Sequence, residues 1–254
     1  MSIWSTEPSF HATIPSDMYT RVLLKLSGEQ LAGKFDSGID AELAAWLGRE
    51  VKKVVDAGAQ VVIMVGGGNY ARGAQLAGHG IGRVTADNVG MLATMMNAVA
   101  LADVFNNAGV VARALTNIKA DQIADQFTHR RAISDLGKGR VVIVAGGIGR
   151  PYLTTDTAAL SLALELECDV VLKATKVDGV YDKDPAEFSD AQKLDTISFD
   201  EAVANEDIKV MDKAALGLAM EHKLPVIVFN AMNEGAIAAI ASGALAGTRI
   251  GDVA

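Results

Sequence analysis

The chain has almost no cysteine and few aromatic residues, and both shortages limit what it can be. Cys168 is the only cysteine among 254 residues, which excludes an intrachain disulfide and a cysteine-rich zinc site. The four histidines are widely scattered and show no metal-ligand spacing. Aromatic residues make up 5% of a chain that is 50% hydrophobic, so the core must consist of aliphatic side chains. We expect Cys168, in an apolar helical stretch, to be a small core residue.

The chain also lacks an excess of positive charge and a long hydrophobic run. Its net charge is −8 and its pI is near 5.0, which argues against a general nucleic-acid binder. Any phosphate must therefore be held by local geometry. No run reaches the roughly 18 apolar residues that would indicate a membrane span. Residues 1–18 lack the features of a signal peptide and are predicted to be a flexible tail before a single domain over 19–254. We expect a cytoplasmic protein.

Apolar segments rich in β-branched residues alternate with amphipathic helical patterns. This alternation predicts an α/β fold, a three-layer αβα sandwich around a mainly parallel sheet. The predicted strands are 20–26, 60–65, 109–115, 140–145, 169–174, 225–229 and 247–250. The predicted helices are 40–57, 86–107, 129–136, 156–167, 198–204, 211–222 and 234–241.

Glycine-bearing polar segments follow four of these strands. They are 25–28, 66–69, 146–149 and 175–179. Ligands of parallel sheets bind beyond the carboxyl ends of the strands, so the four segments are expected to meet at one edge. Three consecutive glycines at 66–68 would let a ligand lie on backbone amides, although such a turn can also be only a tight corner. Neither GxxxxGK[ST] nor a strand followed by GxGxxG is present, which excludes the common phosphate-binding motifs.

Cations stand beside these turns. Lys25 and Lys173 end apolar strands, and Arg72 follows the triple glycine. A lysine in an apolar strand is costly to bury unless it is paired with an anion. Lys25 could instead extend to solvent at a sheet edge, and Arg72 could be a surface residue. Together the three cations could neutralise a transferring phosphoryl group.

Two further segments have both a structural and a functional interpretation. Thr155 or Asp156 could cap the helix that follows, and the free amides of the same helix start could face a phosphate. Asp156 could then orient the lysines or a magnesium-bound water. The loop 176–185 places Tyr181 among polar residues, which suits a purine base, but as a plain loop it would be unremarkable.

Taken together, the chain resembles the amino acid kinase superfamily and, within it, the bacterial uridylate kinases. The resemblance spans about residues 20–250. The motifs that carry it are KLSG at 25–28, GGGN…R at 66–72, ADNVGMLATMMNAVAL at 86–101, PYLTTD at 151–156, KATKVDGVYDKDP at 173–185 and VMDKAA at 210–215. It implies ATP- and Mg-dependent phosphorylation of UMP to UDP, a homohexamer whose dimer contact uses the apolar helix 89–105, and GTP and UTP as possible effectors.

The resemblance also assigns residues by position. Lys25, Arg72 and Asp156 match catalytic positions, and Asp212 an acidic position near the nucleotide. The ATP contacts would be Lys25, Leu26, Ser27, Gly28, Gly68, Arg72, Thr175, Tyr181 and Asp184. The UMP contacts would be Gly67, Asp87, Ile148, Gly149, Arg150, Pro151, Tyr152, Leu153, Thr154 and Thr155. No dedicated protein metal site is expected.

The chain departs from the family pattern at Ile148 and Arg150, where the family usually has a small or polar residue and seldom has arginine. Two alternatives stay open at the level of sequence. One is a superfamily kinase that acts on a carboxylate or carbamate. The other is a nucleotide-binding sensor or storage protein without turnover.

Overall fold

The computed structural model describes residues 18–71, 76, 78, 80–183, 185, 187–188, 190–205 and 211–251. Residues 1–17 lie outside this range, so the predicted flexible tail stays a prediction. Two expected ATP contacts, Arg72 and Asp184, also lie outside the described residues.

The described strands form a nine-stranded sheet in the order β4-β3-β5-β2-β1-β6-β10-β11-β9. Within it, β10 and β11 pair antiparallel and the other neighbours pair parallel, as predicted. A two-stranded hairpin of β7 (Val180–Tyr181) and β8 (Lys193–Leu194) lies beside it. The strands of the sheet are β1 (Arg21–Leu26), β2 (Gln60–Val65), β3 (Ala112–Thr116), β4 (Asp125–Gln126), β5 (Val141–Ala145), β6 (Val170–Thr175), β9 (Thr196–Ile197), β10 (Val226–Asn230) and β11 (Thr248–Ile250).

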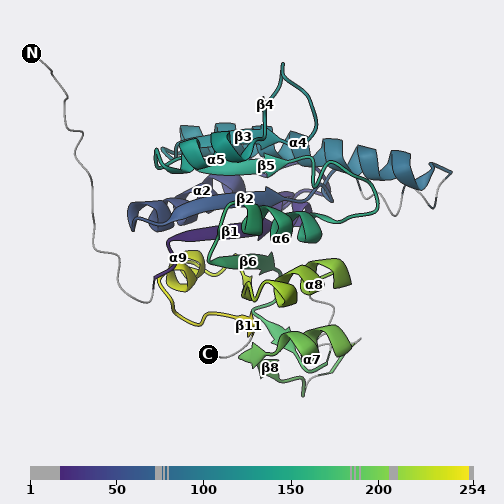
Figure 1. Cartoon of the computed structure of the whole chain (residues 1–254), viewed down its shortest axis with the longest axis vertical. Helices are drawn as coiled ribbons and strands as arrows, with labels where there is room; N and C mark the ends of the chain where they lie inside the picture. Colours follow the sequence, from purple (N-terminus) through teal and green to yellow (C-terminus); the bar gives the residue numbers. More distant parts are fainter. Residues whose placement is uncertain are drawn as a thin grey trace, which may run out of the picture.

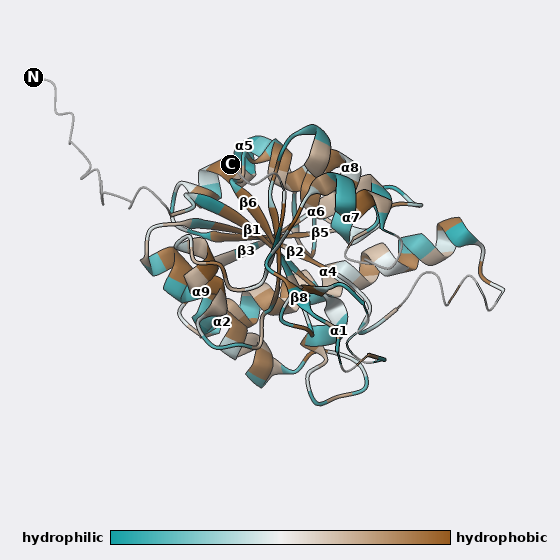
Figure 2. Ribbon diagram, turned by 90° about the horizontal axis from the view of Figure 1, so that it is seen from below, coloured by the Kyte–Doolittle hydropathy of each residue, from teal (hydrophilic) through white to brown (hydrophobic). Residues whose placement is uncertain are grey.

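Helices cover both faces of the sheet, which gives the three layers that the sequence predicts (Figures 1 and 2). Helices α2, α4 and α9 pack on one face. Helices α5, α6, α7 and α8 pack on the other. The helices are α1 (Gly28–Leu31), α2 (Ala41–Asp56), α4 (Arg83–Asn107), α5 (His129–Leu136), α6 (Thr155–Glu165), α7 (Phe199–Ala204), α8 (Lys213–Glu221) and α9 (Ala236–Ala241).

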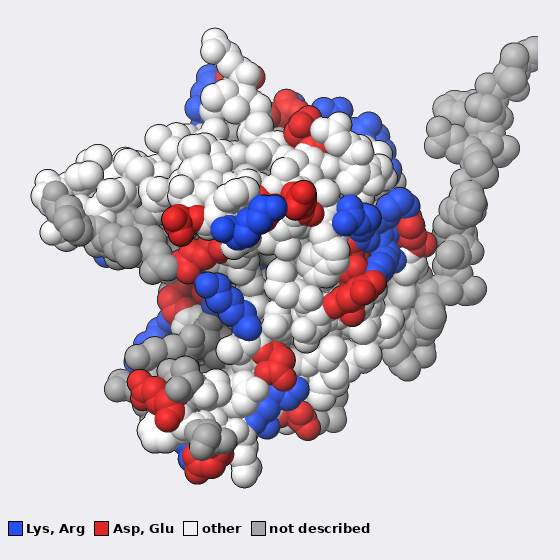
Figure 3. All heavy atoms as spheres, turned by 180° about the vertical axis from the view of Figure 1, so that it is seen from behind, with Lys and Arg blue, Asp and Glu red and all other residues white. Residues whose placement is uncertain are grey.

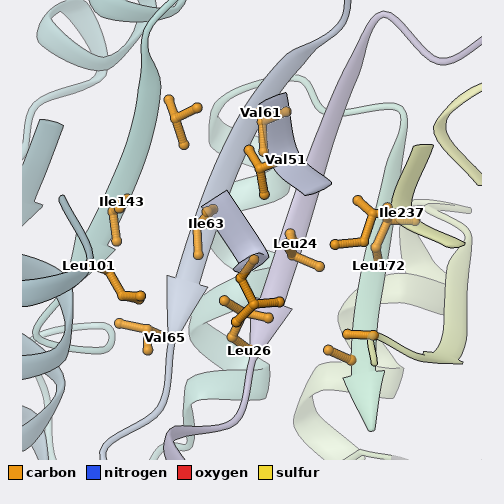
Figure 4. Close-up of a cluster of buried hydrophobic side chains, with 14 of the residues drawn as sticks. Leu24, Leu26, Val51, Val61, Ile63, Val65, Leu101, Ile143, Leu172 and Ile237 are labelled. Atoms are coloured by element: carbon orange, nitrogen blue, oxygen red, sulfur yellow. The ribbon is translucent and has the colours of Figure 1, made fainter. Parts of the chain in front are cut away.

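The central strands are buried on both faces because their side chains alternate between two apolar clusters. Val22, Leu24 and Leu26 of β1 join the cluster under α2, α4 and α9. Leu23, between them, points to the cluster under α6 and α8. Figure 4 shows residues of the first cluster, with Leu24, Ile63 and Leu172 aligned across neighbouring strands. Since burying such a side chain stabilises a fold by about 1.5–3 kcal/mol, the register of the central strands is strongly fixed.

All the predicted strands and helices are present, with ends shifted by a few residues. The sequence did not reveal α1, β4, β7, β8 or β9, because each is too short to show a periodic pattern. The helical placement of Cys168 was wrong: α6 ends at Glu165, and the buried thiol lies in the connection to β6. Burial raises the pKa of this thiol to about 12, which fits an inert core residue.

Helix α4 is the longest element and extends past the sheet (Figure 1). Within the described part of the chain, it is the one helix long and apolar enough to cross a membrane by length and composition alone. It packs against α2, β3 and β5, and its inner residues Leu101 and Phe105 are fully buried. Its apolar character is therefore that of a core helix. Leu92 and Met96 on its outer side remain about half exposed.

Candidate active site

A buried cluster of three charges lies at the carboxyl ends of the two central strands. Lys25 of β1 and Lys173 of β6 are register partners, so both side chains point to the same face, towards the start of α6. There Asp156 forms an ion pair with each lysine. Its Oδ1 is 2.7 Å from Lys25 Nζ, and its Oδ2 is 2.6 Å from Lys173 Nζ. The three side chains are 11–13% exposed. Lys25 is thus a paired central residue, and the solvent-reaching alternative was wrong.

The electrostatics of the cluster follow from two ammonium groups sharing one carboxylate. Burial opposes ionisation of Asp156, yet the two lysines together outweigh it and hold the pKa of Asp156 below its ordinary value. Burial also lowers the pKa of Lys173, against the attraction of Asp156. Elsewhere charges of both signs are interspersed on the face seen in Figure 3. The three groups of the cluster together carry one positive charge, which favours an anionic ligand beside them.

Two of the four glycine turns predicted to meet, those after β1 and β2, are in direct contact. A Cβ atom on Gly28 would lie 2.6 Å from Asn69 Oδ1 and 2.6 Å from the Gly68 nitrogen. A Cβ on Gly67 would lie 2.8 Å from the Gly90 carbonyl oxygen of α4. Side chains are excluded at both positions, since real Cβ atoms do not approach so closely. The turns after β1 and β2 therefore interlock, and the second rests on α4.

The start of α6 is held by hydroxyl groups and one carboxylate. The cap is Thr154, whose Oγ1 accepts from the amides of Asp156 (3.0 Å) and Thr157 (3.3 Å). The prediction of Thr155 or Asp156 as the cap was wrong because the helix starts at Thr155. Thr154 Oγ1 also donates to Asp212, and Thr157 Oγ1 donates to the same carboxylate at 2.8 Å. Asp212 in turn caps α8 by accepting from the amide of Ala215.

A cavity of about 160 Å³ opens between α4, the β2 turn and the segment before α6. Most of the residues expected to contact UMP line it, together with residues of α4 that carried no assignment. The lining residues are Gly67, Ala71, Asp87, Gly90, Met91, Thr94, Gly147, Ile148, Arg150, Leu153, Thr154 and Thr155. Gly149, Pro151 and Tyr152 belong to the same loop but do not line the cavity. The structure thus brings two distant segments of the chain to one pocket.

Asp87 is the acidic residue in the lining of this cavity, and it already has partners. Arg83 Nε donates to both of its oxygens, at 3.0 and 2.8 Å. The amide of Tyr152 donates to Oδ2 at 2.8 Å. Tyr152 has a φ of 69°, unusual for a residue other than glycine, and its ring lies 5.1 Å from the Arg83 guanidinium. The carboxylate of Asp87 therefore holds the strained, exposed backbone of Tyr152 at the rim of the pocket.

The residues expected to contact the adenine lie around the end of β6. Thr175 Oγ1 donates to the Val177 carbonyl at 2.7 Å, and Tyr181 donates to Asp178 at 2.7 Å. This hydrogen bond raises the pKa of Tyr181 and lowers that of Asp178. Gln30 of α1 joins the region to the β1 turn: its Nε2 donates to the Thr175 carbonyl at 2.8 Å, and its Oε1 accepts from the Ser27 amide at 3.2 Å.

Sequence reasoning missed the polar residues that hydrogen-bond to the turns and side chains of the site. Gln30, Thr94 and Asn97 are buried polar side chains within apolar surroundings. Arg83 lies in the first turn of α4, where the helix dipole disfavours a cation. In each case the available signal was a polar residue in a position where an apolar or acidic one would be ordinary.

Comparison with known proteins places this geometry in a family. The family model described as the amino acid kinase family matches residues 20–230. The chain belongs to the amino acid kinase family. A uridylate kinase from Sulfurovum sp. (strain NBC37-1) is 50% identical over 227 residues, which cover 89% of this chain and 96% of that protein. A uridylate kinase from Vibrio cholerae serotype O1 (strain ATCC 39541 / Classical Ogawa 395 / O395) is 46% identical over 241 residues, covering 95% and 99%.

Solved structures of the family are similar as well. The crystal structure of UMP kinase from Bacillus anthracis has a TM-score of 0.89 and 36% identity, and the match covers 93% of this chain and 98% of that one. The UMP kinase structure from Ureaplasma parvum has a TM-score of 0.85 and 33% identity, covering 92% and 99%. The fold is therefore that of this family over more than nine tenths of the chain.

Proposed function

We propose that the protein is a nucleoside monophosphate kinase that transfers the γ-phosphoryl group of ATP to UMP and so forms UDP and ADP. The observation that carries the proposal is the buried cluster of Lys25, Asp156 and Lys173 beside the pocket that contains Asp87 and Thr155. Relatives with the name uridylate kinase, at 46–50% identity over most of the chain, support UMP as the acceptor. They do not favour a carboxylate or carbamate acceptor, or a sensor without turnover.

The chain's own residues contribute alignment and charge. The second pKa of a phosphate monoester is near 6, so the acceptor phosphate arrives largely deprotonated and needs no general base. Lys25 and Lys173 would face the charge that spreads over the equatorial oxygens of the transferred group. Asp156 holds both ammonium groups in place before the substrates arrive, which reduces reorganisation during the reaction. We assign Arg72 to the same charge, as the resemblance implies.

Magnesium fits this site as an ion carried by the nucleotide. Among the described residues there is no group of three His, Cys, Asp or Glu side chains that could hold a metal. Asp156 and Asp212 are the carboxylates near the cluster, and each already has hydrogen-bonding or ionic partners. Mg²⁺ is commonly bound by substrate phosphates, waters and one or two carboxylates, and such a donor set is compatible with these residues. When bound, it would neutralise charge on the β- and γ-phosphates.

The substrates are assigned to opposite sides of the cluster. ATP would lie over the turn from Lys25 to Gly28, with Gly68 and Arg72 near its phosphates and Thr175, Tyr181 and Asp184 near its base and ribose. UMP would occupy the cavity, with its ribose hydroxyls on Asp87 and its phosphate towards Thr155. The apolar Ile148 offers the uracil a packing surface and no side-chain hydrogen bond.

The proposal extends to assembly, location and regulation. Leu92 and Met96 are 53% and 52% exposed on the outer side of α4, and burying them between copies would remove apolar area from water. We therefore propose a homohexamer whose dimer contact uses α4, in a cytoplasmic enzyme of pyrimidine nucleotide synthesis that responds to GTP and UTP. Light scattering should give six times the chain mass of 26.5 kDa.

The decisive experiment measures ADP release by the purified protein with ATP, Mg²⁺ and one acceptor at a time. UMP, CMP, dUMP, aspartate, glutamate and carbamate make up the panel. We expect turnover with UMP well above that with every other acceptor. Turnover with a carboxylate or carbamate instead would reject the assignment of the acceptor. ATP binding without turnover on any acceptor would indicate a nucleotide-binding protein and reject the kinase activity.

A further inference from the structure

Two buried polar side chains interrupt the inner face of α4. Asn97 is 0% exposed and Thr94 is 2% exposed, and they lie three residues apart, so they share one side of the helix. The neighbouring inner residues Ala93, Ala98 and Leu101 are apolar. Burying a hydroxyl or an amide is unfavourable unless its hydrogen bonds are made. Both residues make them with the turns of the active site.

Asn97 holds the turn that follows β2. Its Nδ2 donates to the Gly66 carbonyl at 2.6 Å and to Asn69 Oδ1 at 2.7 Å. Its Oδ1 lies 2.9 Å from Asn69 Nδ2, which also donates to the Gly38 carbonyl. Gly28 packs directly on Asn69 Oδ1 and the Gly66 carbonyl. One buried amide therefore fixes the β2 turn and, through it, the β1 turn that carries the proposed ATP contacts.

Thr94 holds the turn that follows β5. Its Oγ1 donates to the Met91 carbonyl at 2.7 Å and accepts from the Gly146 amide at 2.7 Å. The glycines of this turn have φ values of 80°, 54° and 75° at positions 146, 147 and 149. Because the hydroxyl proton is used within the helix, the oxygen is left as an acceptor for Gly146. This turn begins the loop that lines the acceptor side of the cavity.

These two anchors determine how the peptide groups of both turns are oriented. In a trans peptide the carbonyl and the N–H lie in the peptide plane and point in opposite directions. Anchoring the Gly66 carbonyl on Asn97 therefore directs the Gly67 amide away from Asn97, and Gly67 lines the cavity. Anchoring the Gly146 amide on Thr94 likewise directs the Ala145 carbonyl away, where it accepts from Asn117.

We propose that Thr94 and Asn97 are positioning residues, which hold the phosphate-side turns of both substrates against one helix. The inference rests on the proposed kinase function and deepens it. Thr94 holds the acceptor turn through its hydroxyl and also lines the cavity. Asn97 acts on the interlocked β1 and β2 turns and so on both substrates. A role in folding alone would lower the amount of active protein and leave both Michaelis constants unchanged.

The first test replaces Thr94 by valine, which has the same shape without the hydroxyl. We expect KM for UMP to rise about tenfold, the effect of one lost hydrogen bond, while KM for ATP stays within about twofold. Thr94→Ser restores the hydroxyl and should return KM for UMP to near the wild-type value. UMP affinity by calorimetry gives a readout that does not depend on turnover. Unchanged UMP affinity in Thr94→Val would overturn the role of Thr94.

The second test compares two asparagines on the same helix. Asn97→Leu should raise KM for both ATP and UMP by about tenfold or more, because it removes the anchor of Gly66 and Asn69. Asn106 also makes three hydrogen bonds, to the Ala102 carbonyl and to both backbone groups of Ala112, but it lies at the far end of α4. Asn106→Leu should lower stability and leave both constants unchanged.

The outcomes separate the two proposals. If the wild-type protein does not turn over UMP, the kinase function itself is rejected. If the wild type turns over UMP but Asn97→Leu and Asn106→Leu have the same Michaelis constants, only the positioning role is rejected. If Asn97→Leu does not fold, Asn97→Ser gives a smaller side chain that still removes the amide donor to Gly66. Unchanged constants in that variant would equally overturn the role of Asn97.

Discussion

The charge cluster and the rim of the proposed acceptor pocket are built from the same kinds of charged group but differ in burial and rigidity. In the cluster, Lys25, Asp156 and Lys173 are largely buried and come from rigid elements, and each ammonium nitrogen lies within 2.7 Å of an Asp156 oxygen. On the rim, Asp87 binds Arg83, which is 48% exposed, and the backbone of Tyr152, which is 64% exposed and strained. The cluster is preorganised, whereas the partners of Asp87 can be exchanged for those of a ligand. Charge stabilisation favours the first arrangement, and recognition of an entering substrate favours the second.

Of the substitutions considered, Asp156→Asn should have the largest effect, and it acts on stability. It removes the carboxylate that two buried ammonium groups share, which should lower the free energy of unfolding by about 3–5 kcal/mol at pH 7. Because the pKa of Asp156 is lowered by folding, its contribution is present above its ordinary value of 3.8 and is lost as pH falls through the folded value. Urea unfolding should therefore show a constant difference between wild type and variant from pH 7 to pH 5, and a shrinking one below pH 3.8. A difference that grows on acidification would contradict this account.

Lys25→Ala should have the second largest effect: the protein should stay folded but lose turnover. The ammonium group would stabilise charge that exists mainly in the transition state, so we expect kcat to fall by about 10²–10³-fold. Lys34→Ala is the matched control, since Lys34 is an exposed lysine of the following loop that pairs with Glu42. Steady-state kinetics of both variants decide the point: a kcat of Lys25→Ala within tenfold of the control would remove Lys25 from the mechanism.

Asp87→Ala tests the rim and should act on binding. Its carboxylate is assigned to the ribose hydroxyls of UMP, and a hydrogen bond to a charged group is worth about 1.5–3 kcal/mol. We expect KM for UMP to rise far more than KM for ATP. Asp103→Ala, on the same helix and bonded only to an exposed asparagine in the described structure, should change neither. An equal effect on both substrates, or on ATP alone, would show that Asp87 lies outside the acceptor site.

Arg150→Ala should give the smallest effect. Arg150 is exposed and lines the cavity, so its guanidinium can reach an acceptor phosphate across solvent. We expect UMP affinity to fall by about 1–2 kcal/mol in calorimetry at low salt, with less effect at high salt and none on ATP. Arg130→Ala, an exposed arginine of α5, serves as the control. UMP affinity equal to that of the control would leave Arg150 as a solvated loop residue.

The charge cluster could be predicted from the sequence, whereas the rim of the pocket could be predicted only in part. The difference lies in how far each contact depends on the folded backbone. A lysine at the end of an apolar strand has few alternatives to an anionic partner, so Lys25 and Lys173 indicated a buried anion from the sequence alone. Asp87 was assigned by resemblance, but its pairing with Arg83 and Tyr152 depends on a loop whose strained backbone no local pattern encodes. The bonds of Gln30 to Thr175 and of Asn97 to Gly66 were missed since these partners lie 145 and 31 positions away. Such contacts exist only once the sheet has formed.

Asp212 has a consequence for how the two substrates influence each other. One carboxylate accepts from Thr154 of the acceptor loop and caps α8, and its charge also reaches Lys173 on the donor side. A substrate that shifts any of these groups changes the energy of the others. With the two nucleotides placed as proposed, we expect a coupling free energy between their sites, and such coupling is reciprocal at equilibrium. Whatever factor ATP applies to the dissociation constant of UMP, UMP must apply to that of ATP.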